Sequence, residues 1–347
     1  MKKKLISLAI AAAVTTPFAA QAAGSLTVAN QDITMSGGVT GAYIYNSDTK
    51  RDDFMVTDAL IDLSSEAKAG GMGFDLGIGT LGMNTLTSSF STLFPPIGTD
   101  LGGTPGSVAV QYGYLSVMPT DTITIDAGIL PTNVGYEVAP SYSDGNILRG
   151  MVWNGQPVYY NGARATYSSG GTSVYAEASK LLGAGDSWAV GGSTTMGPVD
   201  GSLNLFSAIN QGSMVDIILS GKAGSFDLAA NFDYTVLADA AKTPGADDNA
   251  YALALYATTP LSGNWTLPMR LEYVDDGSSG IYMGVTGTSN NAYTFTITPT
   301  YNFTDSTFVR AELAYISTDQ KSGALVDDSG VAQDSNITVG FQAGVLL

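Results

Sequence analysis

Residues 265–273 place a positive and a negative charge, Arg270 and Glu272, on the polar side of a strictly alternating segment. The segment reads WTLPMRLEY, so its tryptophan, two leucines, methionine and tyrosine fall together on the other side. A period of two indicates a β-strand with one apolar and one polar face. The chemistry open to such a charge pair is an electrostatic field that acts on passing ions.

Charged residues elsewhere keep to the polar face of their own alternating segments. A charge that faces lipid costs up to about 2–4 kcal/mol near the midplane of a membrane, whereas a charge in a hydrated lumen is solvated. We expect eight of these side chains to line a pore or its constriction: Arg149, Arg164, Arg270, Arg310, Asp126, Glu137, Glu272 and Glu312. The alternative is that they form ion pairs inside a plugged barrel. Acidic residues outnumber arginines on these faces, which predicts a mild preference for cations.

The chain contains no histidine and no cysteine among its 347 residues. This excludes catalytic triads with a histidine base and metal sites built from histidine or thiolate. We therefore expect no enzymatic activity, no cofactor and no metal site. The acidic pairs 247–248 and 327–328 match no calcium-binding spacing and are interpreted as solvated loop charge. A net charge of −17 excludes a nucleic-acid partner.

The N-terminus has the pattern of a cleaved Sec signal peptide, residues 1–22. Three lysines at 2–4 precede a short apolar core at 5–14, and residues 20–22 form a small-x-small cleavage site. About ten apolar residues are too few to span a membrane, and no later segment offers the roughly 18 that a spanning helix needs. The mature domain is expected to be residues 23–347. If that domain lies in a membrane, it must be a closed barrel.

Aromatic residues bracket the apolar faces at both ends. Residues 293–301 repeat the spacing of residues 265–273, with a tyrosine at each end. Such tilted segments cover about 19 Å, close to the apolar band of an outer-membrane barrel, which is about 25 Å tall between two aromatic girdles. The chain is also poor in charged residues, at 13%, where a soluble domain usually has about 25%. A lipid-facing surface explains that deficit.

Turn chemistry divides the chain into about sixteen strands, and an even number is expected of a single-chain bacterial barrel. The predicted strands are residues 31–46, 52–66, 71–81, 107–118, 122–130, 155–167, 172–181, 187–196, 201–210, 213–222, 226–236, 249–259, 264–275, 292–302, 306–317 and 336–347. Every second connection is short, and the long ones lie between. We therefore predict an all-β, antiparallel transmembrane barrel with short periplasmic turns, long extracellular loops and both termini on the periplasmic side. A secreted solenoid would require a fixed short repeat, and the sequence contains none.

Three of the longer connections attract specific interpretations. Residues 131–154 carry aromatic and charged side chains and are the best candidate for an inward-folded constriction, with a plain surface loop as the equal alternative. The connection 82–106 is rich in Thr, Ser and Leu and is interpreted as a surface cap or a contact with a neighbouring barrel. Residues 281–286 are assigned to a loop, because counting them as a strand would break the alternation of short and long connections.

Several motifs are specific enough to suggest a family. They are GILPTNVGYE at 128–137, NILRG at 146–150, QPVYYNGARATY at 156–167, RLEYVDD at 270–276 and VRAEL at 309–313. Together they resemble the putative beta-barrel porin-2, OmpL-like family of bacterial outer membranes, which has a G-x-x-x-T-x-x-G-Y-E segment, a G-x-R strand and R-x-E strands. The motifs span about two thirds of the mature chain. The resemblance implies a porin and names no substrate.

The sequence departs from the family pattern in three places. Leu148 and Gly150 flank Arg149 where the family has serines, and Asn161 stands where a His-Thr pair is common. The last residue is Leu347 rather than the terminal aromatic residue typical of barrels. These departures leave open the role of the segment around Arg149 and the strength of the C-terminal assembly signal.

These observations predict a porin of the outer membrane of a diderm bacterium, exported through the periplasm. Its water-filled pore would let ions and small hydrophilic solutes diffuse passively, filtered by the width at a loop and by the field of arginine and acidic side chains. Its partners would be outer-membrane lipid, those solutes and, since porins of this size are often trimers, further copies in a homotrimer. The alternative is a structural or adhesive barrel that is closed by its loops and conducts nothing.

Overall fold

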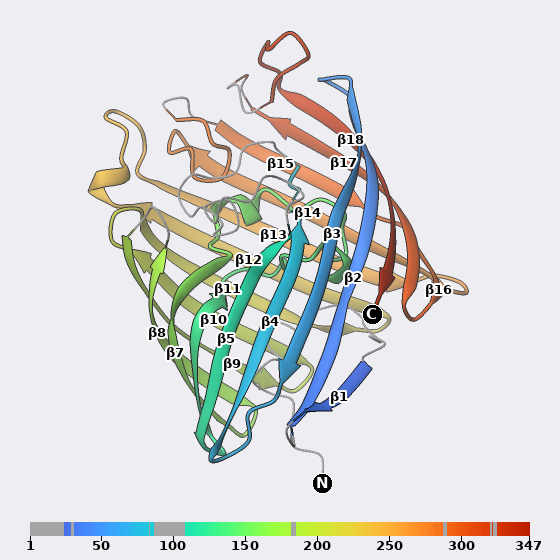
Figure 1. Ribbon diagram of the computed structural model, residues 1–347. Coiled ribbons are helices and arrows are strands. Elements are labelled where there is room, and N and C mark those ends of the chain that lie inside the picture. The colour runs from blue at the N-terminus through green and yellow to red at the C-terminus, as the bar shows by residue number, and fades with distance from the viewer. Residues whose placement is uncertain are drawn as a thin grey trace.

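The computed structural model describes residues 24–28, 31–82, 84–86, 108–181, 185–286, 290–319, 321 and 325–347. The predicted signal peptide, residues 1–22, lies outside them. The strands form one antiparallel sheet that closes on itself, because the last strand pairs with the first long one from Gly38 to Asn46. Figure 1 shows this barrel from the side.

The barrel wall has sixteen strand positions, which we call staves. Its strands are β1 (Gly24–Val28), β2 (Gln31–Asn46), β3 (Arg51–Ser65), β4 (Gly71–Leu81), β5 (Ala109–Thr120), β6 (Ile123–Pro131), β7 (Tyr159–Ser169), β8 (Thr172–Leu181), β9 (Gly185–Met196), β10 (Val199–Ala208), β11 (Gly212–Ala223), β12 (Phe226–Leu237), β13 (Asn249–Pro260), β14 (Trp265–Gly277), β15 (Asn290–Ile297), β16 (Thr300–Thr304), β17 (Thr307–Thr318) and β18 (Ser335–Leu346). Two of these eighteen strands, β1 and β16, continue the stave of another strand and add none of their own.

Strands β15 and β16 are two parts of one stave. Both pair with β14 on one side and with β17 on the other. The break falls at Pro299, which has no N–H to donate, yet Thr298 still donates its N–H to Pro268 O at 2.9 Å. Strand β1 extends the stave of β18, since both pair with the edge of β2 that faces away from β3. The predicted barrel of about sixteen antiparallel strands is therefore confirmed.

All connections at one end of the barrel are short, and the long ones lie at the other end. Two-residue turns join β5 to β6, β7 to β8 and β9 to β10, and the turn at Gly170-Gly171 has φ of 61° and 85°, as a tight hairpin requires. The longer connections, among them 132–158, 238–248 and 319–334, lie at the other end. We call these the turn end and the loop end. In an outer-membrane barrel the turn end faces the periplasm.

Strand β14 shows why the wall has an apolar outside. Leu271 points outward and is 50% exposed, while Arg270 and Glu272 point inward and are 1% exposed. Aromatic rings of neighbouring staves gather toward both ends of this face, with Trp265 against Tyr301 at 5.1 Å between ring centroids and other pairs near the loop end. Exposed apolar side chains between aromatic bands are what a lipid-facing surface requires.

The loop half of the lumen is apolar and filled. Ala250, Ala252 and Ala254 of β13 point inward and are at most 2% exposed, and they belong to one core cluster with Met151 and Tyr282 of the connecting loops. The hydrophobic core of this protein therefore lies inside the barrel. Within the described ranges, no helix has the length and apolar character to cross a membrane.

The outward direction of Leu271 yields a test. Replacing Leu271 with Arg places a charge near the middle of the lipid-facing band, and we expect a loss of about 2–4 kcal/mol in folding free energy. Urea titration of the protein refolded into phospholipid vesicles measures it. Leu271→Met is the matched control and should stay near the native value. An arginine variant as stable as the native chain would show that this face of β14 does not contact lipid.

Candidate functional site

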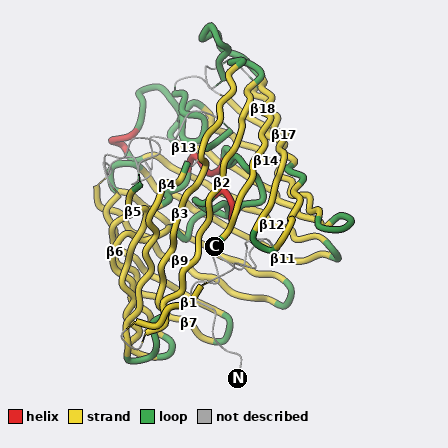
Figure 2. Tube along the Cα trace, turned by 45° about the vertical axis from the view of Figure 1, so that its right-hand side comes forward, coloured by secondary structure: helices red, strands yellow, loops and turns green. Residues whose placement is uncertain are grey.

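The connection between β6 and β7 folds into the barrel. We call residues 132–158 the inner loop; it includes the short 3₁₀ turns η1 (Ser141–Ser143) and η2 (Val152–Gly155). Its two ends are fixed together, because Pro131 and Tyr159 are paired neighbours on adjacent staves. Figure 1 and Figure 2 show the loop enclosed by the strands. The sequence prediction that this segment turns inward is confirmed.

Arg270 binds both limbs of the inner loop from the opposite wall. Its Nη1 donates to Glu137 Oε1 at 2.5 Å and to Leu148 O at 2.8 Å. The neighbouring Glu272 accepts the N–H of Val152 at 3.1 Å and lies 3.2 Å from Arg270 Nε. A planar guanidinium with several donors suits this role, because it satisfies a carboxylate and a carbonyl at once. Through Glu137 and Leu148, Arg270 holds together the two ends of residues 138–147, the part of the loop farthest from β6 and β7.

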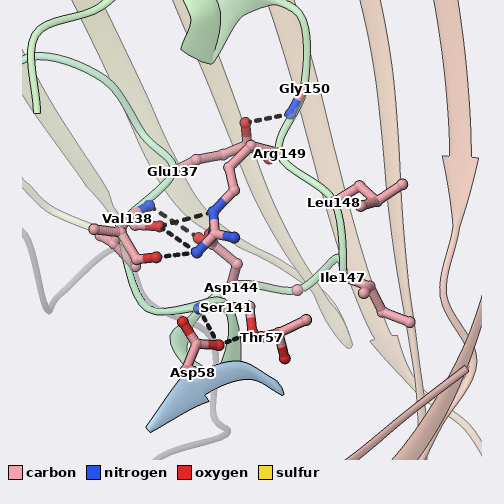
Figure 3. Close-up of polar contacts among 12 residues, drawn as sticks. Thr57, Asp58, Glu137, Val138, Ser141, Asp144, Ile147, Leu148, Arg149 and Gly150 are labelled. Atoms are coloured by element: carbon pink, nitrogen blue, oxygen red, sulfur yellow. Dashed lines mark hydrogen bonds and ion pairs between the residues drawn. The ribbon is translucent and has the colours of Figure 1, made fainter. Parts of the chain in front are cut away.

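Arg310 and Asp58 hold the far end of the loop from β17 and β3. Arg310 donates to Asp144 O at 2.7 Å and to Ser141 O at 2.8 Å. Asp58 accepts the N–H of Ser141 at 3.2 Å and also the Ser141 hydroxyl, as Figure 3 shows. Arg310 also donates to Gln342 of β18 at 2.7 Å. The loop thus crosses the lumen from β6 and β7 to staves on the other side.

Glu312 supplies the third attachment at this end. Its carboxylate accepts the backbone N–H groups of Ile147 at 2.5 Å and Leu148 at 3.1 Å, and the hydroxyl of Thr298 at 2.9 Å. Asn146 adds a side-chain hydrogen bond to the same threonine at 2.7 Å. A buried carboxylate needs several donors to offset its desolvation, and the loop backbone provides two of them.

Arg149 acts within the loop. Its guanidinium donates to Val138 O at 3.4 Å and to the carbonyl of Ala139, and its Nε lies 3.5 Å from the Asp144 carboxylate. It also lies over the Trp153 ring at 5.9 Å. Figure 3 shows the guanidinium reaching back across the loop to these acceptors. Arg149 is 1% exposed, so it fixes the shape of the loop instead of facing water.

Burial changes the acidity of the loop carboxyls. Desolvation raises the pKa of Glu137 and of Asp144, while the nearby guanidinium groups of Arg270 and Arg149 oppose that rise. Glu137 also accepts the N–H of Gly150 at 2.8 Å. The charge of the inner loop is therefore balanced locally by contacts with its own arginine and with the wall.

A further set of wall contacts, on β11 and β12, lies outside the eight residues predicted from sequence. Asp216 accepts the N–H of Gly135 at 3.3 Å, and Asn231 accepts that of Tyr136 at 3.2 Å. Gln156 donates to Asp233 at 2.7 Å. A sequence signal was present, because amides and aspartates share the lumen phase of adjacent strands there. The sequence could not identify the partners of these wall residues, because the loop residues that they bind lie 77 to 95 positions away in the chain.

Arg164 and Asp126 sit where the loop leaves the wall. Arg164 pairs with Glu177 at 2.8 Å and donates to Pro131 O at 2.6 Å and to Asn133 at 3.2 Å. Asp126 is half-buried and accepts the hydroxyl of a serine at 2.6 Å. The structure thus brings seven of the eight predicted residues into contact with the inner loop or its ends, and Asp126 lies beside this set, opposite Arg164 on the adjacent stave. Whether any of the eight lines a water path stays a prediction.

Below the loop, toward the turn end, the lumen wall is acidic and half-buried. The Tyr112 hydroxyl donates to Asp62, and the Tyr114 hydroxyl donates to Asp75 at 3.2 Å. The Tyr112 ring lies across Gly77, where a Cβ atom would overlap the ring. Hydroxyl groups, not cations, are the partners of these two carboxylates among the hydrogen bonds and ion pairs of the described residues. We call this region the vestibule.

Two other connections stack on the inner loop from the loop end. Tyr282 is fully buried and its carbonyl accepts a hydrogen bond from Asn154 at 3.1 Å. Residues 281–286 contain turns and no strand, so the prediction that they form a loop is confirmed. Of the connection 82–106, residues 84–86 pair with the inner loop, and the backbone N–H of Arg149 donates to Asn84 O at 2.9 Å. The interpretation of that connection as a cap or a barrel contact otherwise falls on residues outside the described ranges.

Comparisons with known proteins agree with this architecture. The model of the family described as putative beta-barrel porin-2, OmpL-like, matches residues 32–347. No curated protein matches the chain in sequence. Among solved structures, a trimer form of OmpT of Vibrio cholerae is 11% identical with a TM-score of 0.59, covering 91% of this chain and 99% of its own. OmpF of Salmonella typhi, in complex with daunomycin, is 12% identical with a TM-score of 0.65, covering 92% and 100%. An anion-selective porin from Comamonas acidovorans is 14% identical with a TM-score of 0.61, covering 91% and 99%.

The fit of the loop against Glu272 yields a second test. A Cβ atom at Gly150 would overlap the Glu272 carboxylate, so Gly150→Ala should dislodge the loop and expose Arg149. Trypsin should then cut the folded variant after Arg149, whereas the native protein resists at that bond. Gly41→Ala is the control, because its Cβ would lie 3.7 Å from the nearest atom. Equal resistance of all three proteins would contradict a loop seated by this contact.

Proposed function

Because this chain belongs to the putative beta-barrel porin-2, OmpL-like family of the outer membrane, we propose that it lets ions and small hydrophilic solutes diffuse passively through its lumen, with a mild preference for cations. The family and the porin-like fold give the channel class. The charge distribution inside the barrel supports the finer statement.

The observation that carries the proposal is the acidic vestibule beneath the inner loop. Asp62 and Asp75 are half-buried carboxylates whose partners are tyrosine hydroxyls. Asp126, on the same side of the barrel, binds a serine hydroxyl and also lies opposite Arg164 on the adjacent stave, so of these three the carboxylates without a cationic partner are Asp62 and Asp75. Carboxylates without a cationic partner attract counter-ions into a low-dielectric passage and raise the local concentration of cations.

The lumen arginines contribute little net field in this arrangement. Arg270 binds Glu137 and lies beside Glu272, and Arg149 lies beside Asp144. Arg164 likewise pairs with Glu177, so three of the four lumen arginines are matched by a carboxylate, while Arg310 binds carbonyl and amide oxygens. The porin from Comamonas acidovorans is described as anion-selective, so a barrel of this kind supports either sign. The uncompensated side chains of the vestibule favour cations here.

A second candidate function has its own supporting observation. The loop half of the lumen is packed with apolar side chains from the wall and from the inner loop, as in a barrel that serves a structural or adhesive role and conducts nothing. Conductance in a planar bilayer distinguishes the two functions. Stable ohmic steps from purified protein in a planar bilayer support the channel, and silence supports the closed barrel.

We also propose that the protein assembles as a homotrimer. The support is the trimer form recorded for Vibrio cholerae OmpT, which shares the fold. Native mass spectrometry of the protein extracted in mild detergent should give three copies per particle. A mass corresponding to a single chain under the same conditions would contradict this assembly.

The vestibule carboxylates make the cation preference testable. The double variant Asp62→Asn/Asp75→Asn removes the negative charge of this carboxyl pair from the water path, and we expect the permeability ratio of K⁺ to Cl⁻ to fall about two- to threefold. Reversal potentials across a bilayer with a KCl gradient measure it. Asp328→Asn neutralises an exposed loop carboxylate outside the lumen and should leave the ratio unchanged. Clear anion selectivity of the native protein would overturn the proposal.

A further inference from the structure

We propose that the inner loop is an autoinhibitory strap, and that the channel opens when the far part of this loop leaves the wall. The inference rests on the proposed diffusion function and adds a closed state to it. The moving part is residues 138–147, which we call the tip segment. The structure then represents the closed form of the pore.

The first step of the argument is that the lumen is filled at the level of the inner loop. Leu60, Tyr160, Phe206, Ala252 and Thr296 point inward from β3, β7, β10, β13 and β15, and each is at most 2% exposed. These staves are spread around the whole wall. A water-filled passage along any of these five positions would leave the inward side chain accessible. Protein therefore fills the described lumen at these five positions, and the inner loop supplies part of that filling, since Tyr160, Phe206 and Ala252 share one core with Met151, Val152 and Trp153.

The second step is that the inner loop is attached in two unlike ways. Met151, Val152 and Trp153, beyond the tip segment, belong to the large apolar core of the barrel. Tyr142 of the tip segment belongs instead to a separate small cluster with Phe308 and one leucine. Apolar packing holds the first part in place. Of the tip segment, Ala139 also belongs to the large core and Ile147 is buried, but its contacts with the far wall are mainly polar.

The attachments of the tip segment are polar and reversible. They are the contacts of Asp58 with Ser141, of Arg310 with the carbonyls of Ser141 and Asp144, and of Glu312 with the N–H of Ile147. Water can replace each of these hydrogen bonds once the segment moves, because charged side chains hydrate strongly. The apolar contacts beyond the tip segment have no such substitute.

The third step is that the tip segment is built to move as one unit. Arg270 binds Glu137 and Leu148 O, so it closes the base of the segment from both sides. Arg149, which follows the tip segment, binds Val138 O and lies beside Asp144, so it links two positions of the segment to each other. Release of the wall contacts alone would free a preformed body while its base stays anchored to β14.

A cysteine reporter gives a direct test, because the native chain contains no cysteine. Ile147 lies in the tip segment and is fully buried, so Ile147→Cys should react slowly with a membrane-impermeant maleimide in proteoliposomes. Adding Asp58→Asn/Glu312→Gln weakens two wall attachments by removing the charge of their acceptors, and we expect labelling about tenfold faster. The same two changes without the cysteine should raise the open probability in planar bilayers by a similar factor.

Glu177→Gln is the matched control. Glu177 is a buried, lumen-facing glutamate that binds Arg164 instead of the tip segment, so labelling and open probability should stay native. If the double variant does not fold, Ser141→Ala is the second variant, because it removes only the hydroxyl that donates to Asp58. It should accelerate labelling in the same direction.

Two outcomes would overturn the strap. One is rapid labelling of Ile147→Cys with all wall attachments intact, and the other is equal labelling and equal channel steps in the native, release and control proteins. A different result separates this inference from the proposed function. If release accelerates labelling and no variant ever conducts, the mobile tip segment is supported and passive diffusion is the part that fails.

Discussion

The structure depends on one constraint, which is that lipid offers no hydrogen bonds to a backbone. Every N–H and C=O that crosses the membrane must find its partner within the wall, and a sheet achieves this only by closing on itself. The pairing of β18 with β2 completes that closure. Sixteen staves then enclose more space than wall side chains can fill. The inner loop follows from this geometry, because the space must hold either water or protein.

A loop that fills the lumen must also find hydrogen-bond partners for its backbone, as the wall must in lipid. The backbone of the inner loop is shielded from water and carries donors that helices or sheets would normally satisfy. Wall carboxylates and amides perform that task here: Glu312, Glu272, Asp216 and Asn231 all accept loop N–H groups. The charged face of each stave is thus a set of acceptors for a folded loop.

Much of the fold could be predicted from sequence because its signals are local. Period-two alternation and turn residues give the strands, their number and the side chains that point inward. The surroundings of those inward side chains could not be predicted, since the contacts of Arg270 with the loop join positions 122 to 133 residues apart. One local clue was available. The run from Tyr251 to Leu255 is apolar on both faces, which indicates a lumen occupied by protein at that level.

The way in which the wall holds the inner loop also bears on how freely the loop sequence can vary. Glu312 and Glu272 bind the backbone N–H groups of Ile147, Leu148 and Val152 and make no demand on their side chains. Only proline removes the donor, so these hydrogen bonds tolerate any other side chain that still packs in the buried space around Ile147, Leu148 and Val152. The path of the loop is therefore encoded largely in the strands. A designer could graft different loop chemistry onto this wall and still expect it to settle along the same route.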